Sequence, residues 1–252
     1  MAEPTGGRGR IVLGTMRLHE AQRSVGEWVE FFVAAHRLGV TTLHSSSEYE
    51  SFPLFCEILS RLARDAPDVR FRHMVKLGEP HFDEADFEPK RLSERIDCYR
   101  DALRVDCIAD VQWMWRGGLD NDPVRISRFL ARQSPIADGV DALKVGGRIG
   151  RFLCFPYTPP FAQAALDVAA VDGLVVYRNV QEREYDDAID GAAARAKPSV
   201  VIRPFNAGKA FDGRGPGPLA LLRLALDKPG IESAILSTSS IDHVEQLIER
   251  ES

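Results

Sequence analysis

Short runs of β-branched and apolar residues alternate with longer amphipathic stretches eight times along this chain of 252 residues. Each run has the length of a strand, and each stretch has the apolar spacing of a helix. Strands that are separated by helices pair in parallel, because a parallel pair needs a long crossover connection. Eight strand–helix pairs in about 250 residues are typical of a closed (β/α)8 TIM barrel, an α/β fold.

An open, doubly wound sheet is the alternative arrangement of such pairs. It normally needs about five or six of them, and its dinucleotide-binding form carries Gly-x-Gly-x-x-Gly after the first strand. Here the first strand leads into Gly14-Thr15-Met16 instead. We therefore predict the barrel. Because no low-complexity linker divides the sequence, we also predict a single domain over residues 1–252, with a flexible segment at 1–9.

The predicted strands and helices follow one another in strict alternation. The strands are residues 10–13, 40–45, 71–77, 107–115, 148–155, 173–177, 199–203 and 231–236. The helices are residues 25–38, 53–64, 89–103, 123–131 with an extension over 141–145, 160–168, 185–196, 219–226 and 241–249. A Gly- and Pro-rich loop, 206–218, precedes the seventh helix.

The charge balance and the apolar pattern exclude several classes of protein. Lys plus Arg number 32 and Asp plus Glu 37, which gives a formal net charge of −5. A general nucleic-acid binder needs a clustered basic face to displace the counterions of phosphate. No apolar run approaches the roughly 20 residues that cross a bilayer, and residues 1–10 lack the apolar core of a secretory signal. We expect a cytoplasmic protein that acts on a small molecule and binds neither nucleic acid nor membrane.

The four cysteines are widely spaced, at Cys56, Cys98, Cys107 and Cys154, and none belongs to a Cys-x-x-Cys pair. The spacing therefore predicts no zinc or other metal site. We expect reduced thiols that are buried or half-buried. No sequence feature specifies an oligomeric state.

In a barrel of this kind, the functional side chains lie at the carboxyl ends of the strands. This rule selects the residues that follow each predicted strand, before any chemistry is considered. They are residues 16–17, 44–49, 76, 114–116, 151–155, 178–179, 203–209 and 237–240.

Several segments, in order along the chain, resemble the aldo-keto reductase family. The strongest are Arg10-Ile-Val-Leu-Gly-Thr-Met-Arg-Leu18 and Gly39-Val-Thr-Thr-Leu-His-Ser-Ser-Ser-Glu-Tyr49, of which the second follows the family pattern Gly-x-x-x-hydrophobic-Asp-x-x-x-x-Tyr. Further matches are Val75–Gly78, Leu103–Ile108, Gly147–Gly150 and Lys228–Ile235. The resemblance extends from Arg10 to about Ile248. It implies an eight-stranded α/β barrel that reduces a carbonyl group of a small organic substrate with NADPH.

The family uses an Asp, Tyr, Lys and His tetrad, and this chain matches two of the four positions. The resemblance implies that Tyr49 is the proton donor and Lys76 the cation that assists it. His44 occupies the Asp position and Met114 the His position, and Trp115 matches a Trp that often follows.

A phenol has a pKa of about 10 and exchanges protons poorly at neutral pH unless a nearby cation lowers that pKa. Lys76 could supply the cation. A neutral His44 does not neutralise the ammonium and a protonated one repels it, so we expect a lowered pKa for His44, Lys76 or both. Met114 cannot donate a hydrogen bond, which costs a substrate oxygen about 1–3 kcal/mol in a dry site. A solvated loop is expected to hold Arg116, Asp120 and Asp122.

The resemblance also implies a cofactor site across the ends of four strands. Its candidate residues are Thr15, Met16, Asn179, Arg203, Phe205, Ser237, Ser239 and His243. The segment 203–208 resembles the family's pyrophosphate loop, and His243 holds the position of one Arg that contacts the 2′-phosphate. The amides and hydroxyls of residues 237–240 could bind a phosphate, since helix N-termini attract anions, or could simply cap the last helix.

The predicted wall of the substrate site is Met114, Trp115 and Phe152, with Arg17, Arg178 and Arg203 as candidate anion contacts. Three functions are open at this point. The leading hypothesis is a diverged NADPH-dependent carbonyl reductase that uses Tyr49 and Lys76. The second is a lyase, dehydratase or isomerase that moves a proton with Tyr49, His44 and Lys76 and needs no nicotinamide. The third is a non-catalytic binding barrel, because a fold alone does not select a function.

Overall fold

In the computed structural model, which describes residues 10–209 and 215–248, eight parallel strands close into a barrel in chain order. The strands are β1 (Ile11–Gly14), β2 (Thr42–Ser45), β3 (Arg72–Gly78), β4 (Ile108–Met114), β5 (Ile149–Cys154), β6 (Gly173–Tyr177), β7 (Ser199–Ile202) and β8 (Ile231–Leu236). β1 pairs with both β2 and β8, which closes the ring. The predicted (β/α)8 barrel is confirmed. The flexible segment predicted at residues 1–9 lies outside the described residues.

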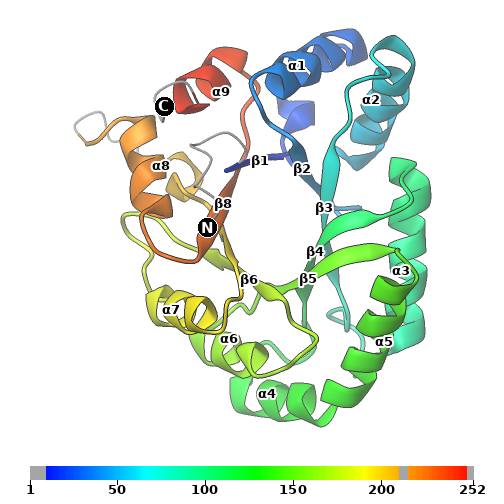
Figure 1. The fold of residues 1–252 in the computed structure, drawn as a ribbon, viewed down its shortest axis with the longest axis vertical. Coiled ribbons are helices and arrows are strands. Elements are labelled where there is room, and N and C mark those ends of the chain that lie inside the picture. The colour runs from blue at the N-terminus through cyan, green and yellow to red at the C-terminus, as the bar shows by residue number, and fades with distance from the viewer. Residues whose placement is uncertain (1–9, 210–214, 249–252) are drawn as a thin grey trace.

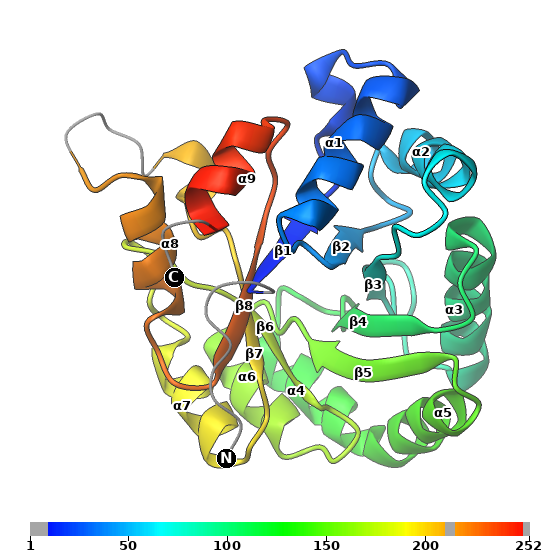
Figure 2. The same ribbon diagram turned by 45° about the horizontal axis from the view of Figure 1, so that its top comes forward.

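The helices form an outer ring around the strands (Figure 1). They are α1 (Val25–Arg37), α2 (Phe52–Asp65), α3 (Pro89–Leu103), α4 (Asp122–Ala131), α5 (Gln133–Val145), α6 (Pro159–Leu166), α7 (Asp186–Ala194), α8 (Pro218–Leu226) and α9 (Ile241–Ile248). Two short 3₁₀ helices, η1 (Leu18–Ala21) and η2 (Asn206–Gly208), lie after β1 and β7. The turned view of Figure 2 places α9 beside α1, so the last helix completes the ring next to the first.

The predicted fourth helical region is two helices, because the chain leaves helical geometry at Arg132, with φ −107° and ψ 9°. Pro135 explains the break. It is the third residue of α5, where its missing N–H is tolerated, but its ring would clash with the carbonyl of Ala131 in a continuous helix.

Apolar side chains fill two layers on opposite sides of the strands. The inner layer lies inside the barrel and consists of Val12, Met74, Met114, Leu153, Phe155, Val175, Val200 and Ile235. The outer layer lies between the strands and the helices and includes Trp113, Trp115 and Phe152. Because successive side chains of a strand alternate between its faces, Met114 points inward while its two Trp neighbours point outward.

The thiols are less buried than the sequence predicted, since Cys98 and Cys107 are exposed. On α3 the buried face is formed by Leu92, Ile96, Tyr99 and Leu103, and Cys98 falls on the opposite side. In the described part of the chain, no helix is both long enough and apolar enough to cross a membrane.

Candidate active site

Tyr49, Lys76 and His44 meet at the carboxyl rim of the barrel, as the sequence predicted. The Lys76 Nζ lies 5.0 Å from the centroid of the Tyr49 ring. The ring centroids of His44 and Tyr49 are 6.1 Å apart. Alternation along the strands gives the reason, because His44 of β2 pairs in register with the inward-facing Met74 of β3, two residues before Lys76.

A turn after β2 places Tyr49, and a residue that the sequence did not indicate holds that turn. The N–H of Tyr49 donates to the Ser46 carbonyl at 3.1 Å. The Tyr99 hydroxyl accepts from the N–H of Ser47 at 2.7 Å and donates to the Lys76 carbonyl at 2.8 Å. One phenol on α3 therefore ties the Tyr49 turn to the strand that carries Lys76.

Glu48 is the carboxylate beside Lys76, and sequence reasoning did not single it out. Its Oε2 lies 3.3 Å from the Lys76 Nζ. The Arg116 guanidinium binds the same carboxylate through both terminal nitrogens, with Nη2 at 2.8 Å from Oε2. The only sequence signal was position, because Glu48 and Arg116 both fall in segments that follow strands.

The expectation of a solvated loop for Arg116 is wrong, because its side chain is only 3% exposed. Its Nε donates to the Tyr157 hydroxyl at 3.1 Å, and its guanidinium lies 4.7 Å from the Phe82 ring centroid. Arg116 follows β4 in the inward phase of the alternation, so it turns into the mouth. Asp122 is the first residue of α4 and binds Arg125 at 2.6 Å, whereas Asp120 is exposed as expected.

His44 is buried and binds Gln112 rather than Lys76, with 2.8 Å between its Nε2 and the amide oxygen. Burial lowers the pKa of His44 to about 4, a change that the Gln112 contact opposes and the charge of Lys76 reinforces. Burial also lowers the pKa of Lys76, against the effect of Glu48. A lowered pKa was expected for one or both of these groups; both are lowered, and His44 is neutral at pH 7.

Burial raises the pKa of Tyr49, and the nearby Tyr99 and Glu48 add to this rise. The net change is opposite to the lowering that Lys76 was expected to cause, because burial outweighs the nearby positive charge. Burial alone would raise the pKa of Glu48, but the hydrogen bonds and charges of Arg116 and Lys76 outweigh it and lower that pKa to about 2. At neutral pH the group holds a protonated phenol and an ionised carboxylate.

Of the predicted substrate wall, Met114 reaches this group and two residues do not. The Met114 Sδ lies 3.4 Å from the Tyr157 hydroxyl. Trp115 and Phe152 are fully buried in the outer layer, on the helix side of their strands, because alternation turns them away from the barrel interior. The aromatic side chains near the mouth are instead Phe155, Tyr157 and Tyr177, whose rings pack edge to face at 4.8 and 5.3 Å.

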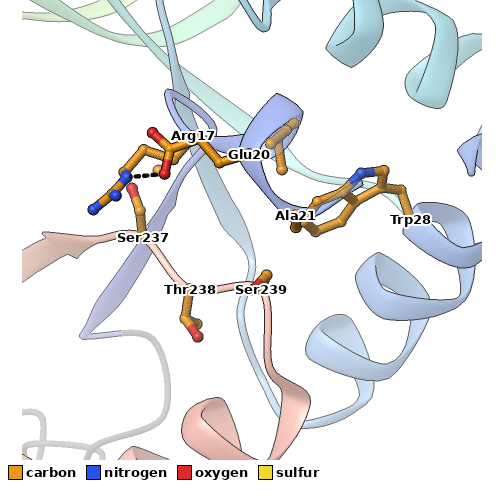
Figure 3. Close-up of a pocket in the computed structure, with 9 residues that line it drawn as sticks. Arg17, Glu20, Ala21, Trp28, Ser237, Thr238 and Ser239 are labelled. Carbon is orange, nitrogen blue, oxygen red and sulfur yellow. Dashed lines mark hydrogen bonds and ion pairs between the residues drawn. The ribbon is translucent and has the colours of Figure 1, made fainter. Parts of the chain in front are cut away.

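The residues predicted for the cofactor separate into those at cavities and those used within the loops. One cavity of about 310 Å³ lies between the loops after β1 and β8, and Ser237 and Ser239 line it (Figure 3). A second, of about 320 Å³, is lined by Phe205, Ser237 and His243 together with apolar residues of α8 and α9. Thr15 is buried and donates to the His44 carbonyl at 3.0 Å, whereas Met16 is exposed.

The side chains of Asn179 and Arg203 contact other residues of the protein. The Asn179 amide donates to Glu182 at 2.5 Å and to the Arg203 carbonyl at 3.0 Å, and its oxygen accepts two backbone N–H groups. The Arg203 guanidinium lies 4.6 Å from the centroid of the Tyr177 ring. The Asn179 amide therefore organises its own loop and links it to the loop after β7, and its cofactor contact stays a prediction.

Two of the three predicted anion contacts are already paired within the chain. Arg17 binds Glu20 at 2.6 Å, the dashed contact of Figure 3. Arg178 is buried and binds Asp186 at 2.8 Å and Asp227 at 2.9 Å. Among the described residues, no group of three or more His, Cys, Asp or Glu side chains could hold a metal ion.

Solved structures share this architecture. A candidate aldo-keto reductase from Pseudomonas aeruginosa aligns with a TM-score of 0.73 at 23% identity, over 98% of this chain and 92% of its own. The chain has the fold of the aldo-keto reductases. A Klebsiella pneumoniae aldo-keto reductase in complex with NADP and acetate aligns with a TM-score of 0.71 at 18% identity, over 95% and 84% of the two chains. A Bacillus halodurans member in its holo form gives 0.67 at 15%, over 95% and 85%.

No protein-family model matches the sequence, and no curated protein matches it in a sequence comparison. The similarity to the aldo-keto reductases is therefore carried by the barrel, and the chemistry has to be argued from the residues at its rim.

Proposed function

We propose that this protein is a diverged oxidoreductase of the aldo-keto reductase type that reduces the carbonyl group of a small organic substrate with NADPH. The observation that supports this proposal is the convergence of Tyr49 and Lys76, with 5.0 Å between the ammonium and the phenol ring, at the carboxyl rim. Active sites of such barrels lie at this face.

Tyr49 carries its proton at neutral pH, and it becomes an effective donor when a neighbouring cation stabilises the phenolate that it leaves. Its raised pKa keeps the phenol protonated at neutral pH. When the carbonyl carbon accepts a hydride, negative charge develops on the oxygen, and Tyr49 supplies the proton that yields the alcohol. Lys76 then stabilises the phenolate that is left on Tyr49, because an adjacent cation favours the charged form of an acid.

The residues around Ser237 fit a nicotinamide dinucleotide. Phe205, Leu236 and Leu247 form an apolar wall against which a ring could pack. The hydroxyls of Ser237 and Thr238 precede the N-terminus of α9, a favourable place for a phosphate. A Cβ at Gly14 would lie 2.5 Å from the Ser237 Oγ, so only glycine leaves this hydroxyl in place. When bound, NADPH would supply the hydride.

One observation favours a redox-neutral reaction as the second candidate. His44 is held neutral, with its ring 6.1 Å from that of Tyr49. A neutral imidazole beside a protonated phenol is a base and an acid that could move a proton without any nicotinamide, as a lyase, dehydratase or isomerase requires.

The test begins with cofactor binding and then removes one hydroxyl. NADPH is titrated against the fluorescence of the protein's tryptophans, with NADH alongside, and turnover is measured on a panel of small aldehydes and ketones. Tyr49→Phe should lower kcat by about 100-fold or more, the usual range for losing a general acid, and leave the Kd for NADPH nearly unchanged. Tyr185→Phe is the control, because Tyr185 is buried in the outer layer.

Two results would overturn the reductase. The first is that neither NADPH nor NADH binds with a Kd below the high micromolar range. The second is that Tyr49→Phe reduces a carbonyl substrate at the same rate as the unaltered protein. In the first case the redox-neutral reaction becomes the leading candidate. It then requires that His44→Ala abolish an activity that needs no added cofactor.

A further inference from the structure

Lys76 has a carboxylate partner that comes from the loop and not from its neighbouring strand. Within the described chain, its ammonium makes one ion pair, with the Oε2 of Glu48 at 3.3 Å. His44, on the adjacent strand, binds Gln112 and is neutral. The negative charge that balances Lys76 therefore lies four residues further along, at the residue directly before Tyr49.

Arg116 fixes the position of this carboxylate. A glutamate that is 33% exposed on a loop would normally sample several rotamers. Here the guanidinium engages both carboxylate oxygens, and such a bidentate pair sets orientation as well as distance. Arg116 is itself immobilised by the Tyr157 hydroxyl at 3.1 Å and the Phe82 ring at 4.7 Å.

The charges that face one another at this point come from four segments. Lys76 on β3 faces Glu48, Arg116 and the neutral His44. Glu48 faces Lys76, Arg116 and His81, with 3.3 Å to the His81 Nε2, and the other nitrogen of His81 lies 3.3 Å from Asp83. Without Glu48, two cations would share a half-buried space. Lys76 would lose its proton first, because an arginine stays protonated.

We propose that Glu48 is a positioning residue that keeps Lys76 charged and over the Tyr49 ring, and that Arg116 holds Glu48 in place for this purpose. The proposal rests on the catalytic role proposed above for Lys76. Glu48, in the loop after β2, and Arg116, after β4, then balance the charge of Lys76 in the candidate active site.

The test measures the titration of Lys76 directly, without substrate or cofactor. The six lysines are labelled by reductive ¹³C-methylation and titrated by NMR, and the Lys76 signal is the one absent from Lys76→Arg. In Glu48→Gln the pKa of Lys76 should fall by about one pH unit or more, the usual effect of a charge within 4–6 Å. Arg116→Lys keeps the positive charge but loses the bidentate contact that holds Glu48, so the pKa of Lys76 should fall there too. The signal of the added lysine is the one that the unaltered protein lacks.

Glu50→Gln is the matched control, since Glu50 is two residues away and 82% exposed. It should leave the pKa of Lys76 unchanged. In steady-state assays the alkaline limb of kcat/KM should move to lower pH in Glu48→Gln and return toward its original place in Glu48→Asp, which retains the charge. A role confined to stability would not move that limb.

An unchanged Lys76 titration in Glu48→Gln overturns the proposal. If that variant does not fold, Arg116→Lys decides, because it retains the positive charge and removes only the bidentate contact with Glu48, and an unchanged Lys76 titration is then the contradicting result. The two proposals fail separately. If the pKa of Lys76 shifts with the expected sign but the protein reduces no carbonyl, the reductase is contradicted and the Glu48–Lys76 pairing is supported. If the protein is a reductase but the pKa of Lys76 is unchanged in Glu48→Gln, the pairing is contradicted and the reductase is supported.

Discussion

Single hydroxyls and carboxylates decide the geometry of the rim. Tyr99 is the clearest case, because its oxygen accepts from the Ser47 N–H and donates to the Lys76 carbonyl. The side chain comes from α3, outside the barrel, and reaches the turn that presents Glu48 and Tyr49. A residue that touches no candidate reactant thus controls where two candidate reactive groups stand.

We expect Tyr99→Phe to lower the free energy of unfolding by about 1–3 kcal/mol, because the Ser47 N–H loses its acceptor and the Lys76 carbonyl keeps only the Ser46 hydroxyl, at 3.1 Å. It should also lower kcat, because the turn that carries Tyr49 loses its tie to β3. Urea unfolding and steady-state kinetics measure the two effects. Tyr185→Phe is the control, since its hydroxyl makes no hydrogen bond within the described residues. Equal stability of the two variants would contradict the assigned role of Tyr99.

At the scale of elements, helix ends decide how the outer ring sits on the barrel. α1 begins with a capping box, in which the Glu27 N–H donates to the Ser24 Oγ at 3.3 Å and the Ser24 N–H donates to the Glu27 carboxylate at 2.8 Å. The helix that starts there carries Trp28 into the outer layer and to the edge of the cavity beside Ser237. The cap thus fixes the first turn of a helix that borders the proposed cofactor site.

Ser24→Ala should therefore lower the free energy of unfolding by about 1 kcal/mol, the usual cost of losing an N-cap. Ser60→Ala, inside α2, should instead raise it by a few tenths of a kcal/mol, since alanine has the higher helix propensity. Chemical denaturation of both variants measures the difference. A Ser24→Ala protein as stable as the unaltered one would show that the capping box contributes nothing.

At the scale of the whole molecule, buried histidines make the fold sensitive to mild acid. Burial lowers the pKa of both His44 and His73 from 6.5 to about 4. The unfolded chain therefore binds more protons than the folded chain between these values. The stabilisation is complete above pH 6.5 and is lost as the pH falls toward 4. Glu48 affects stability at lower pH than the histidines. Its pKa falls from 4.5 to about 2, so its contribution to the free energy of unfolding is lost only below pH 4.5.

The free energy of unfolding should accordingly fall between pH 6.5 and 4 by up to about 1.4 kcal/mol per pH unit for each of the two histidines. His73 packs against the Phe55 ring at 6.1 Å, away from the rim. His73→Asn should remove about half of this slope. His19→Asn, at a side chain that is 38% exposed, should leave it intact. A flat profile between these pH values would contradict the burial argument.

The sequence determined the fold because the spacing of apolar residues within each strand and helix is a local property that can be recognised without the tertiary structure. Alternating strand and helix patterns gave the number and order of the strands, and the strand-end rule brought Tyr49, Lys76 and His44 to one rim. The sequence did not reveal which side chains of each strand point into the barrel and which point toward the helices. Trp113, Met114 and Trp115 are all apolar, and only closure of the barrel decides that Met114 faces inward.

The charge balance of the rim was decided by the tertiary structure alone. Glu48 and Arg116 are 68 residues apart, and Tyr99 is 52 residues from the turn that it holds. Neither pairing has a signature in sequence, because each arises only when loops after different strands are brought together. For Asn179 the tertiary structure adds one long-range contact, to the Arg203 carbonyl after β7, to the hydrogen bonds within its own loop. Local pattern specified which side chains reach the rim, and three-dimensional proximity specified which of them neutralise, orient or bury one another.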